Sequence, residues 1–175
     1  MHLSISFTTR APRSGEKDGV HYHFISEQRF KEMIQAGDFF EYAKVHGDWK
    51  GTARQSVLPL LDADKDVLLE IDWQGAQQVR SKINNTVSIF VLPPSLEILQ
   101  QRLCQRAQDS ASVINQRMRA ASQEISHYTE YDYIIINRSF DDALAQLCAI
   151  FQASRLRCCA QQQRLQHVIE TLTTP

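Results

Sequence analysis

The sequence contains no phosphate-binding loop of the G-x-x-x-x-G-K-[ST] type. Six glycines are present, and none is followed by lysine and then serine or threonine at the required spacing. A strand, such a loop and its helix would need about 25–30 residues. These 175 residues therefore lack the backbone cradle that such loops provide for the phosphates of a nucleoside triphosphate.

Several other features are missing as well. No apolar run reaches the roughly 18–20 residues that span a bilayer, and no charged segment followed by an apolar one opens the chain. We therefore expect no membrane partner, no secretion and a cytoplasmic location. The net charge of −1 argues against nucleic acid as the main partner. The four cysteines and the histidines lack metal-ligand spacing, so we predict reduced thiols and no metal held by the protein alone.

Apolar runs alternate with helical patterns along most of the chain. Mainly apolar runs at Val67–Ile71, Val87–Leu92 and Ile134–Ile136 predict parallel strands that are buried on both faces. Helical periodicity precedes, separates or follows them at residues 27–36, 54–61, 74–83, 96–106 and 140–155. Strands that alternate with helices predict an α/β domain with a parallel sheet, and the length fits a single domain.

One internal segment departs from this rhythm. Residues 21–50 contain short strands on either side of a helix over Glu27–Ala36, which Ser26 is expected to cap and Gly37 to end. An insertion of this kind suits a small substrate-binding subdomain.

The C-terminal part begins with a helix that starts at a capping-box-like pair, Ser139 and Asp142. Four apolar residues are expected on its buried side, namely Phe140, Leu144, Leu147 and Phe151. After Arg155 the sequence turns polar, so residues 155–175 are expected to form a frayed helix and tail.

A basic turn lies near the N-terminus, in the stretch Ser6-Phe7-Thr8-Thr9-Arg10-Ala11-Pro12-Arg13-Ser14-Gly15-Glu16. Arg10 and Arg13 stand on either side of Pro12, and Tyr22 follows shortly after. Planar guanidinium groups bind phosphate oxygens in pairs and keep their charge, so the two arginines form a fork that suits a phosphate. On charge alone, a solvated basic turn explains this stretch equally well.

This stretch closely resembles the GMP-binding segment of guanylate kinases. The resemblance continues in family order through Phe39-Phe40-Glu41, Gly51-Thr52, Leu69-Glu70-Ile71-Asp72-Trp73-Gln74-Gly75-Ala76 and Ile125-Ser126-His127-Tyr128. It implies a three-layer nucleoside monophosphate kinase-like fold with a parallel core sheet. It also implies a small GMP-binding region at about residues 8–52 and a lid at about 105–119. The family's N-terminal strand, phosphate loop and helix have no counterpart in this sequence.

The resemblance assigns the phosphate end of a GMP site. Arg10, Arg13 and Tyr22 match the family's ligands of the α-phosphate. The family usually adds a tyrosine from a Tyr-Tyr-Gly-[ST] turn, and here Lys50 stands in the place of that tyrosine. A lysine ammonium can still reach a phosphate as a point charge, so phosphate binding is expected to persist with altered geometry.

The resemblance also assigns the base end. Glu41 matches the carboxylate that accepts the N1–H and N2–H₂ donors of guanine, with Ser6 and Thr52 as hydroxyls near the base. Without the resemblance, a surface carboxylate would be the simpler interpretation of Glu41. Glu70 and Asp72 lie at the end of the predicted strand Val67–Ile71, where ligands gather in parallel sheets, and an acid there can hold magnesium-bound water, ribose or base.

Phosphoryl transfer is assigned to arginines of the lid. Arg106 and Arg117 match residues that bring positive charge onto the transferring phosphoryl group. The usual Arg-Gly-[ST]-[DE] lid sequence is here Arg106-Ala107-Gln108-Asp109, so its glycine and hydroxyl are absent. Asn137 matches the residue beside adenine. The implied reaction is ATP and GMP to ADP and GDP, with Mg²⁺ bound to ATP and no covalent intermediate.

Other interpretations stay open at this point. Guanylate-kinase-like domains in scaffolds lose the phosphate loop and bind proteins, and a GMP-binding remnant unable to use ATP would also fit. Retention of Arg10, Arg13, Glu41 and Asp72 argues against a purely protein-binding module. A shortened gene model, an engineered truncation or a natural fragment would each give this sequence. Assembly into a homo-oligomer is left open.

Overall fold

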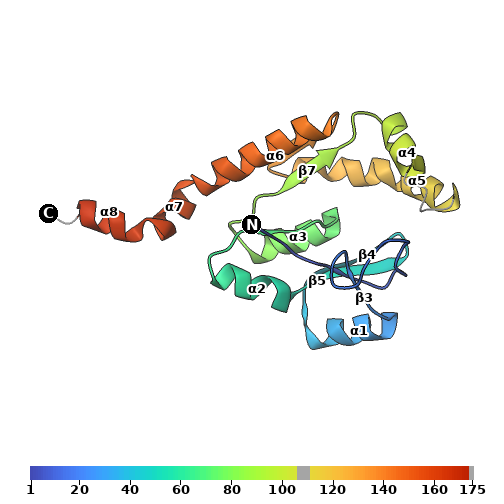
Figure 1. Ribbon diagram of the computed structural model, residues 1–175, viewed down its shortest axis with the longest axis horizontal. Coiled ribbons are helices and arrows are strands. Elements are labelled where there is room, and N and C mark those ends of the chain that lie inside the picture. The colour runs from blue at the N-terminus through green and yellow to red at the C-terminus, as the bar shows by residue number, and fades with distance from the viewer. Residues whose placement is uncertain (106–110, 174–175) are drawn as a thin grey trace. The chain divides into compact units, whose positions relative to one another are not determined.

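A computed structural model describes residues 1–105 and 111–173 of the chain (Figure 1). These residues divide into two compact units. The first unit comprises Met1–Thr86 with Leu103–His127, and the second comprises Val87–Arg102 with Tyr128–Pro175.

The first unit is built around a four-stranded sheet with the order β3-β2-β5-β4. Its strands are β2 (Phe7–Thr8), β3 (His23–Phe24), β4 (Phe39–Val45) and β5 (Asp48–Ala53). Strands β4 and β5 form an antiparallel hairpin whose register places Glu41 opposite Thr52. His46 and Gly47 make the turn, both with positive φ, as tight hairpin turns require.

Helix α1 (Glu27–Ala36) has the start and stop that the sequence predicts. The hydroxyl of Ser26 accepts a hydrogen bond from the Arg29 amide at 3.1 Å, and Gly37 ends the helix with a φ of 71°. The apolar face of α1 packs Phe30 and Met33 against residues of β4 and β5 in a buried core. This core fixes one side of the hairpin that contains Glu41.

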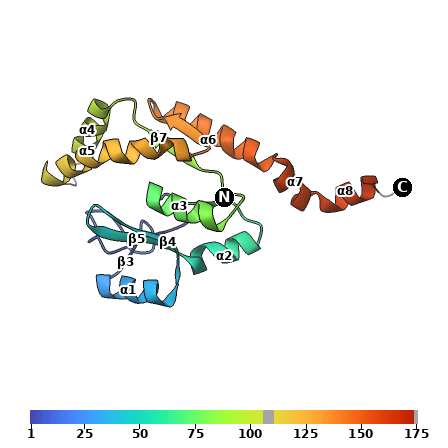
Figure 2. The ribbon, with the colours of Figure 1, turned by 180° about the vertical axis from the view of Figure 1, so that it is seen from behind.

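Helix α3 (Trp73–Lys82) lies along β4, on the other side of the sheet from α1 (Figures 1 and 2). The Gln78 side-chain amide donates to the Tyr42 carbonyl at 2.7 Å and accepts from the Tyr42 amide at 3.3 Å. The Lys82 ammonium donates to the Phe40 carbonyl. Because β4 is an edge strand, these bonds satisfy backbone groups that would otherwise face solvent, and they dock α3 firmly.

Two parallel strand pairs confirm the predicted α/β class. Strand β1 (His2–Leu3) pairs with β6 (Val67–Leu68) in the first unit, and β7 (Ile89–Leu92) pairs with β8 (Tyr133–Ile136) in the second. Strands β6 and β7 are shorter than predicted, whereas β8 begins one residue earlier than predicted, at Tyr133.

The prediction that these strands are buried on both faces is wrong for most of their residues. Ile135 is 2% exposed, whereas Val91 and Ile134 are 55% and 46% exposed. Among the described residues, β1–β6 and β7–β8 each form a sheet of two strands, with no third strand beside them. Few elements therefore cover the faces of either pair.

The remaining helices are α2 (Arg54–Asp62), α4 (Leu96–Gln105), α5 (Ala111–Ser126), α6 (Phe140–Arg155), α7 (Cys158–Arg164) and α8 (Gln166–Thr173), with a 3₁₀ turn η1 (His127–Glu130). Among the helices that the structure describes, none is both long and apolar enough to cross a membrane.

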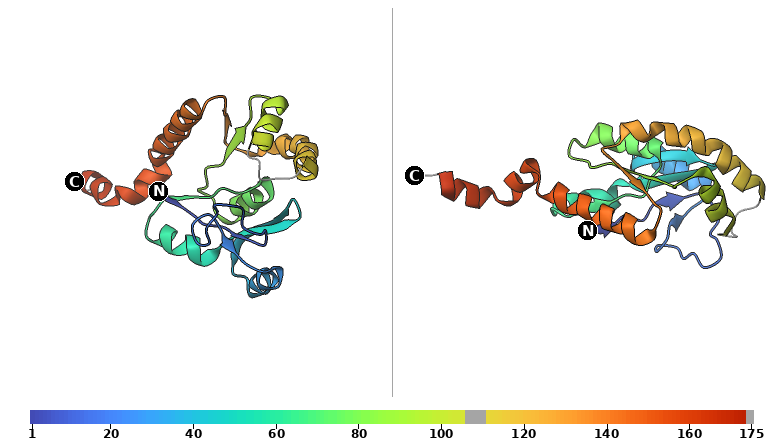
Figure 3. Two further views of the ribbon diagram at one scale, coloured as in Figure 1. Left: turned by 45° about the vertical axis from the view of Figure 1, so that its right-hand side comes forward. Right: turned by 90° about the horizontal axis from the view of Figure 1, so that it is seen from above.

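Helix α6 begins as predicted, because the Ser139 hydroxyl accepts from the Asp142 amide at 3.2 Å and donates to the Asp142 carboxylate at 2.6 Å. Its predicted buried side is instead open at Phe140 and Leu144, which are 73% and 44% exposed. Residues expected to fray after Arg155 form α7 and α8, which follow α6 as separate segments (Figure 3).

Candidate functional site

A buried carboxylate lies at the centre of the first unit. Glu41 on β4 is 3% exposed, and its Oε1 accepts a hydrogen bond of 2.6 Å from the hydroxyl of Thr52 on β5, which is fully buried. Burial raises the pKa of Glu41, and the charge of Asp72 adds to this effect, while the hydrogen bond from Thr52 opposes it. Such a carboxyl group, held in place and poor in solvent, is suited to pair with a ligand that offers hydrogen-bond donors.

Asp72 caps helix α3, and its charge acts on two other residues of the candidate site. Its Oδ1 accepts from the Gly75 amide at 3.0 Å, and its Oδ2 accepts from the Gln74 side chain at 3.2 Å. Its charge acts on the pKa of Glu41 and also on that of Lys50. Glu70, the second predicted acid, is exposed in the segment between β6 and α3.

An acidic residue, Glu16, binds both Arg10 and Arg13 of the predicted arginine fork. Arg10 Nη2 donates to both carboxylate oxygens of Glu16, at 2.8 and 2.9 Å, and the Arg13 backbone amide donates to Glu16 at 2.7 Å. The hydrogen bond from Arg10 is the main reason that the pKa of Glu16 lies below its usual value. The guanidinium carbon of Arg10 lies 5.6 Å from the ring centroid of Tyr22, so the structure brings these two predicted ligands together.

Lys50 interacts electrostatically with both arginines of the fork and with Arg117 of the predicted lid. It lies on β5 opposite Thr8 of β2 and is half-buried. Burial lowers the pKa of Lys50, and the charges of Arg117, Arg10 and Arg13 lower it further. We call Arg10, Arg13, Lys50 and Arg117 the cationic cluster. Mutual repulsion in this cluster is partly relieved by Asp72, so an added anion would be stabilised there.

The other predicted site residues are Arg106, Asn137 and Ser6. Arg106 lies outside the described residues. Asn137 belongs to the second unit, where its amide donates to the Leu92 carbonyl at 2.8 Å and its carbonyl accepts from Arg102 at 2.9 Å. Ser6 is half-buried just before β2, and its carbonyl accepts from the His23 amide at 2.9 Å.

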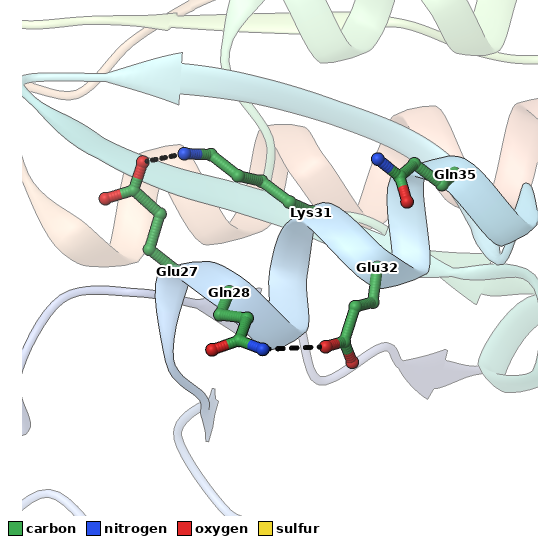
Figure 4. Close-up of a pocket in the computed structure, with 5 residues that line it drawn as sticks. All are labelled: Glu27, Gln28, Lys31, Glu32 and Gln35. Atoms are coloured by element: carbon green, nitrogen blue, oxygen red, sulfur yellow. Dashed lines mark hydrogen bonds and ion pairs between the residues drawn. The ribbon is translucent and has the colours of Figure 1, made fainter.

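A surface hollow on α1 contains none of the predicted residues. It is lined by Glu27, Gln28, Lys31, Glu32 and Gln35, which all project from exposed positions of one helix (Figure 4). Their side chains pair with one another, as in the 2.9 Å contact of Lys31 with Glu27. The hollow is therefore a solvated helix surface, distinct from the buried Glu41 and Thr52.

Sequence patterns did not predict Glu16 or Gln78 as residues of the site. Glu16 stood within the basic stretch, and its spacing of three residues from Arg13 is a signal for a local turn contact. Gln78 gave no signal, because its partner Tyr42 lies far away in the sequence and is brought near only by the docking of α3.

Comparison with known proteins identifies the family of the chain. The guanylate kinase family model matches residues 1–154. A guanylate kinase from Xanthomonas campestris pv. campestris (strain 8004) is 61% identical over 170 residues, covering 97% of this chain and 84% of that protein. One from Xylella fastidiosa (strain Temecula1 / ATCC 700964) is 60% identical over 173 residues, covering 99% and 85%. The crystal structure of guanylate kinase from Anaplasma phagocytophilum matches with a TM-score of 0.79 and 32% identity, covering 93% of this chain and 84% of that one.

The fold and its solved counterpart define an α/β protein of the nucleoside monophosphate kinase type. Within this class the match extends along nearly the whole sequence. The chain belongs to the guanylate kinase family, whose enzymes phosphorylate GMP.

Proposed function

We propose that the first unit binds GMP with its guanine at Glu41 and its phosphate at the cationic cluster, in position to accept a phosphoryl group from ATP. One observation supports this most directly. A carboxylate that is 3% exposed lies in the same compact unit as four cations, and Asp72 acts on the pKa of both Glu41 and Lys50. A ligand with hydrogen-bond donors at one end and a dianion at the other matches this arrangement.

The base end has the chemistry to select guanine. Guanine offers N1–H and N2–H₂ donors side by side, which one carboxylate can accept together. Adenine places an acceptor at N1, so it would face the Glu41 carboxylate with a lone pair. Oε1 of Glu41 already accepts from Thr52 and still has acceptor capacity for the base. Ser6 and Asp72 are proposed to complete this end, with Glu70 at its margin.

At the phosphate end, a phosphate must bind Arg10 in competition with the Glu16 carboxylate. Arg10 is held by Glu16 through charge-assisted bonds, and a phosphate would add to the same fork. Arg13, Tyr22 and Lys50 are proposed as its other ligands. The GMP-binding region would thus span about residues 8–52.

Arg117, with Arg106 of the proposed lid at residues 105–119, is assigned to the transferring phosphoryl group. Positive charge there would stabilise the charge that spreads over its oxygens in the transition state. Asn137 is assigned to adenine. Among residues 1–105 and 111–173, no three His, Cys, Asp or Glu side chains are grouped to hold a metal ion. Mg²⁺ is therefore proposed to be held mainly by the phosphates of ATP, as is usual for this ion.

Replacement of Arg13 by alanine tests the phosphate end. We expect GMP affinity to fall about 10- to 100-fold, because a charge-assisted hydrogen bond contributes roughly 1.5–3 kcal/mol. Guanosine, which lacks the phosphate, should bind the variant and the parent equally well. Arg29→Ala, which removes an exposed arginine of α1, is the matched control and should change neither affinity. Calorimetry with both ligands measures these values, and a parallel loss for GMP and guanosine would contradict the assignment.

The pH dependence of GMP binding tests Lys50. Because burial and neighbouring cations lower the pKa of Lys50, the residue should lose its proton at a pH below that of an ordinary lysine. GMP affinity of the parent should therefore fall with rising pH over that range, whereas Lys50→Arg should keep its charge and its affinity. Titration of GMP itself is common to both proteins and cancels in the ratio of their dissociation constants. A ratio that stays constant from pH 7 to about 10 would exclude Lys50 as a phosphate ligand.

A further inference from the structure

Gly75 occupies the place where helix α3 crosses the Glu41 side chain. It is the third residue of α3 and is buried. A Cβ atom built on Gly75 would overlap Glu41 Oε2 and would lie 3.2 Å from Glu41 Cδ. The next neighbour, Cβ of Ile71, would be 3.3 Å away, a contact that small shifts can relieve. The carboxylate of Glu41 therefore occupies the space that any other residue at position 75 would fill.

The carboxylate has little freedom to move aside. On its other side Oε1 is held by the Thr52 hydroxyl at 2.6 Å, and both residues are buried. Helix α3 has little freedom to retreat either, because Gln78 bonds to both backbone groups of Tyr42 and Asp72 caps the Gly75 amide. A side chain at position 75 must therefore displace the carboxylate rather than the helix.

Glycine is also an unfavourable choice for the body of a helix, since alanine has the higher helix propensity. Gly75 has an ordinary helical backbone and needs no positive φ. Its presence is thus explained by the space it leaves open, and not by the conformation of α3.

We propose that Gly75 is a specificity-determining residue, which acts by leaving the space that positions the Glu41 carboxylate for guanine. This inference rests on the proposed role of Glu41 in GMP binding. Gly75 is a positioning residue here, because its effect on the nucleotide passes through Glu41. The inference extends the base-recognition site from the strands β4 and β5 to the first turn of α3.

The test is Gly75→Ala, with GMP and AMP affinities measured by calorimetry on the 175-residue chain. We expect GMP affinity to fall at least 10-fold and AMP affinity to change little, so that the preference for GMP shrinks. Gln77→Ala is the control, because it introduces the same methyl side chain at an exposed position of α3, away from Glu41. It should leave both affinities unchanged. A Gly75→Ala protein that is folded and keeps the parent's preference would overturn the inference.

A second pair of variants separates positioning from packing. In Gly75→Ala/Glu41→Asp the carboxylate is one methylene shorter and can withdraw from the new methyl group, so part of the lost preference should return. In Glu41→Ala the obstacle is gone, and adding Gly75→Ala should not lower the melting temperature further. If Gly75→Ala lowered the melting temperature of Glu41→Ala as much as that of the parent, Gly75 would serve packing against Ile71. That result would refute the positioning role.

The outcomes also distinguish this inference from the proposed function. A parent chain that binds GMP and AMP equally would contradict the assignment of Glu41 to guanine. If the parent prefers GMP through Glu41 and the Gly75→Ala variant keeps that preference undiminished, only the role of Gly75 is contradicted.

Discussion

Glu41→Gln is expected to weaken GMP binding by about 1–3 kcal/mol, because it leaves one guanine donor facing an amide donor in a buried site. The affinity for AMP should stay the same or rise slightly, since the glutamine amide can donate to N1 of adenine. The preference for GMP over AMP should therefore decrease about 5- to 150-fold. Calorimetry with both nucleotides gives the two affinities directly.

The same substitution should not destabilise the protein without ligand. Burial raises the pKa of Glu41, so the folded state disfavours the ionised form. The free energy of unfolding then falls as pH rises from the ordinary glutamate pKa through the raised one, and glutamine does not titrate. At neutral pH the melting temperature of Glu41→Gln should accordingly equal or exceed that of the parent. The carboxylate would thus be retained for binding at some expense of stability.

Glu32→Gln on the exposed surface of α1 is the matched control for this pair of measurements. It removes the same charge and should change neither the nucleotide preference nor the melting temperature by a large amount. An unchanged GMP affinity in a folded Glu41→Gln protein would refute the role of Glu41. A lower melting temperature together with equal losses for GMP and AMP would instead indicate a purely structural carboxylate.

Local signals in the sequence predicted the elements that depend on few neighbours. Helix α1 was predictable because its cap at Ser26, its stop at Gly37 and the spacing of Phe30 and Met33 all lie within one short segment. The approach of Arg10 to Tyr22 likewise follows from the adjacency of β2 and β3. In these cases the physical determinants are close in the sequence.

Burial of the apolar runs could not be predicted in the same way. An apolar run indicates a tendency to be buried, but the outcome depends on the elements that cover it. Val91 and Ile134 belong to the pair β7 and β8, and both remain largely exposed. Phe140 illustrates the same point for a helix, because the periodicity of α6 predicted a buried side that is open in the structure.

Contacts between distant segments are the other part that sequence patterns leave undetermined. The effect of the Arg117 charge on Lys50 joins residues far apart in the sequence, and the proximity of Glu41 to Gly75 depends on the docking of α3 along β4. Partner choice is a related problem, since a carboxylate and a phosphate both satisfy an arginine fork. For that reason the pairing of Arg10 with Glu16 became clear only in the structure.

A polypeptide of these 175 residues is expected to show at least about 10³-fold less GMP-dependent ADP formation than one extended at its N-terminus by a guanylate kinase strand, glycine-rich loop and helix. Phosphoryl transfer depends mainly on positioning and electrostatic stabilisation, and well-placed reactants can gain roughly 7–11 kcal/mol from positioning. The cationic cluster supplies charge at the GMP end, but the sequence contains no G-x-x-x-x-G-K-[ST] loop to hold the β- and γ-phosphates of ATP.

The added segment should also raise the melting temperature. Two-stranded sheets are marginally stable by themselves, and β1–β6 and β7–β8 are both two-stranded among the described residues. A further strand could pair with backbone groups at the open edges of these sheets, and exposed apolar side chains such as Ile134 and Phe140 leave surface that added segments could bury. An extended chain in which alanine replaces the loop lysine separates the two effects, because it should keep the added stability and lose most of the turnover.

A coupled assay of ADP release, with and without GMP, measures turnover for all three chains under the same conditions. GMP binding by the 175-residue chain, measured in parallel, should persist, because Glu41, Thr52 and the cationic cluster all lie within its first unit. The combination of retained GMP affinity and lost turnover is specific to a missing seat for ATP, since unfolding would abolish both. Robust GMP-dependent turnover by the 175-residue chain would contradict this prediction and would require a triphosphate site formed by other residues of the chain.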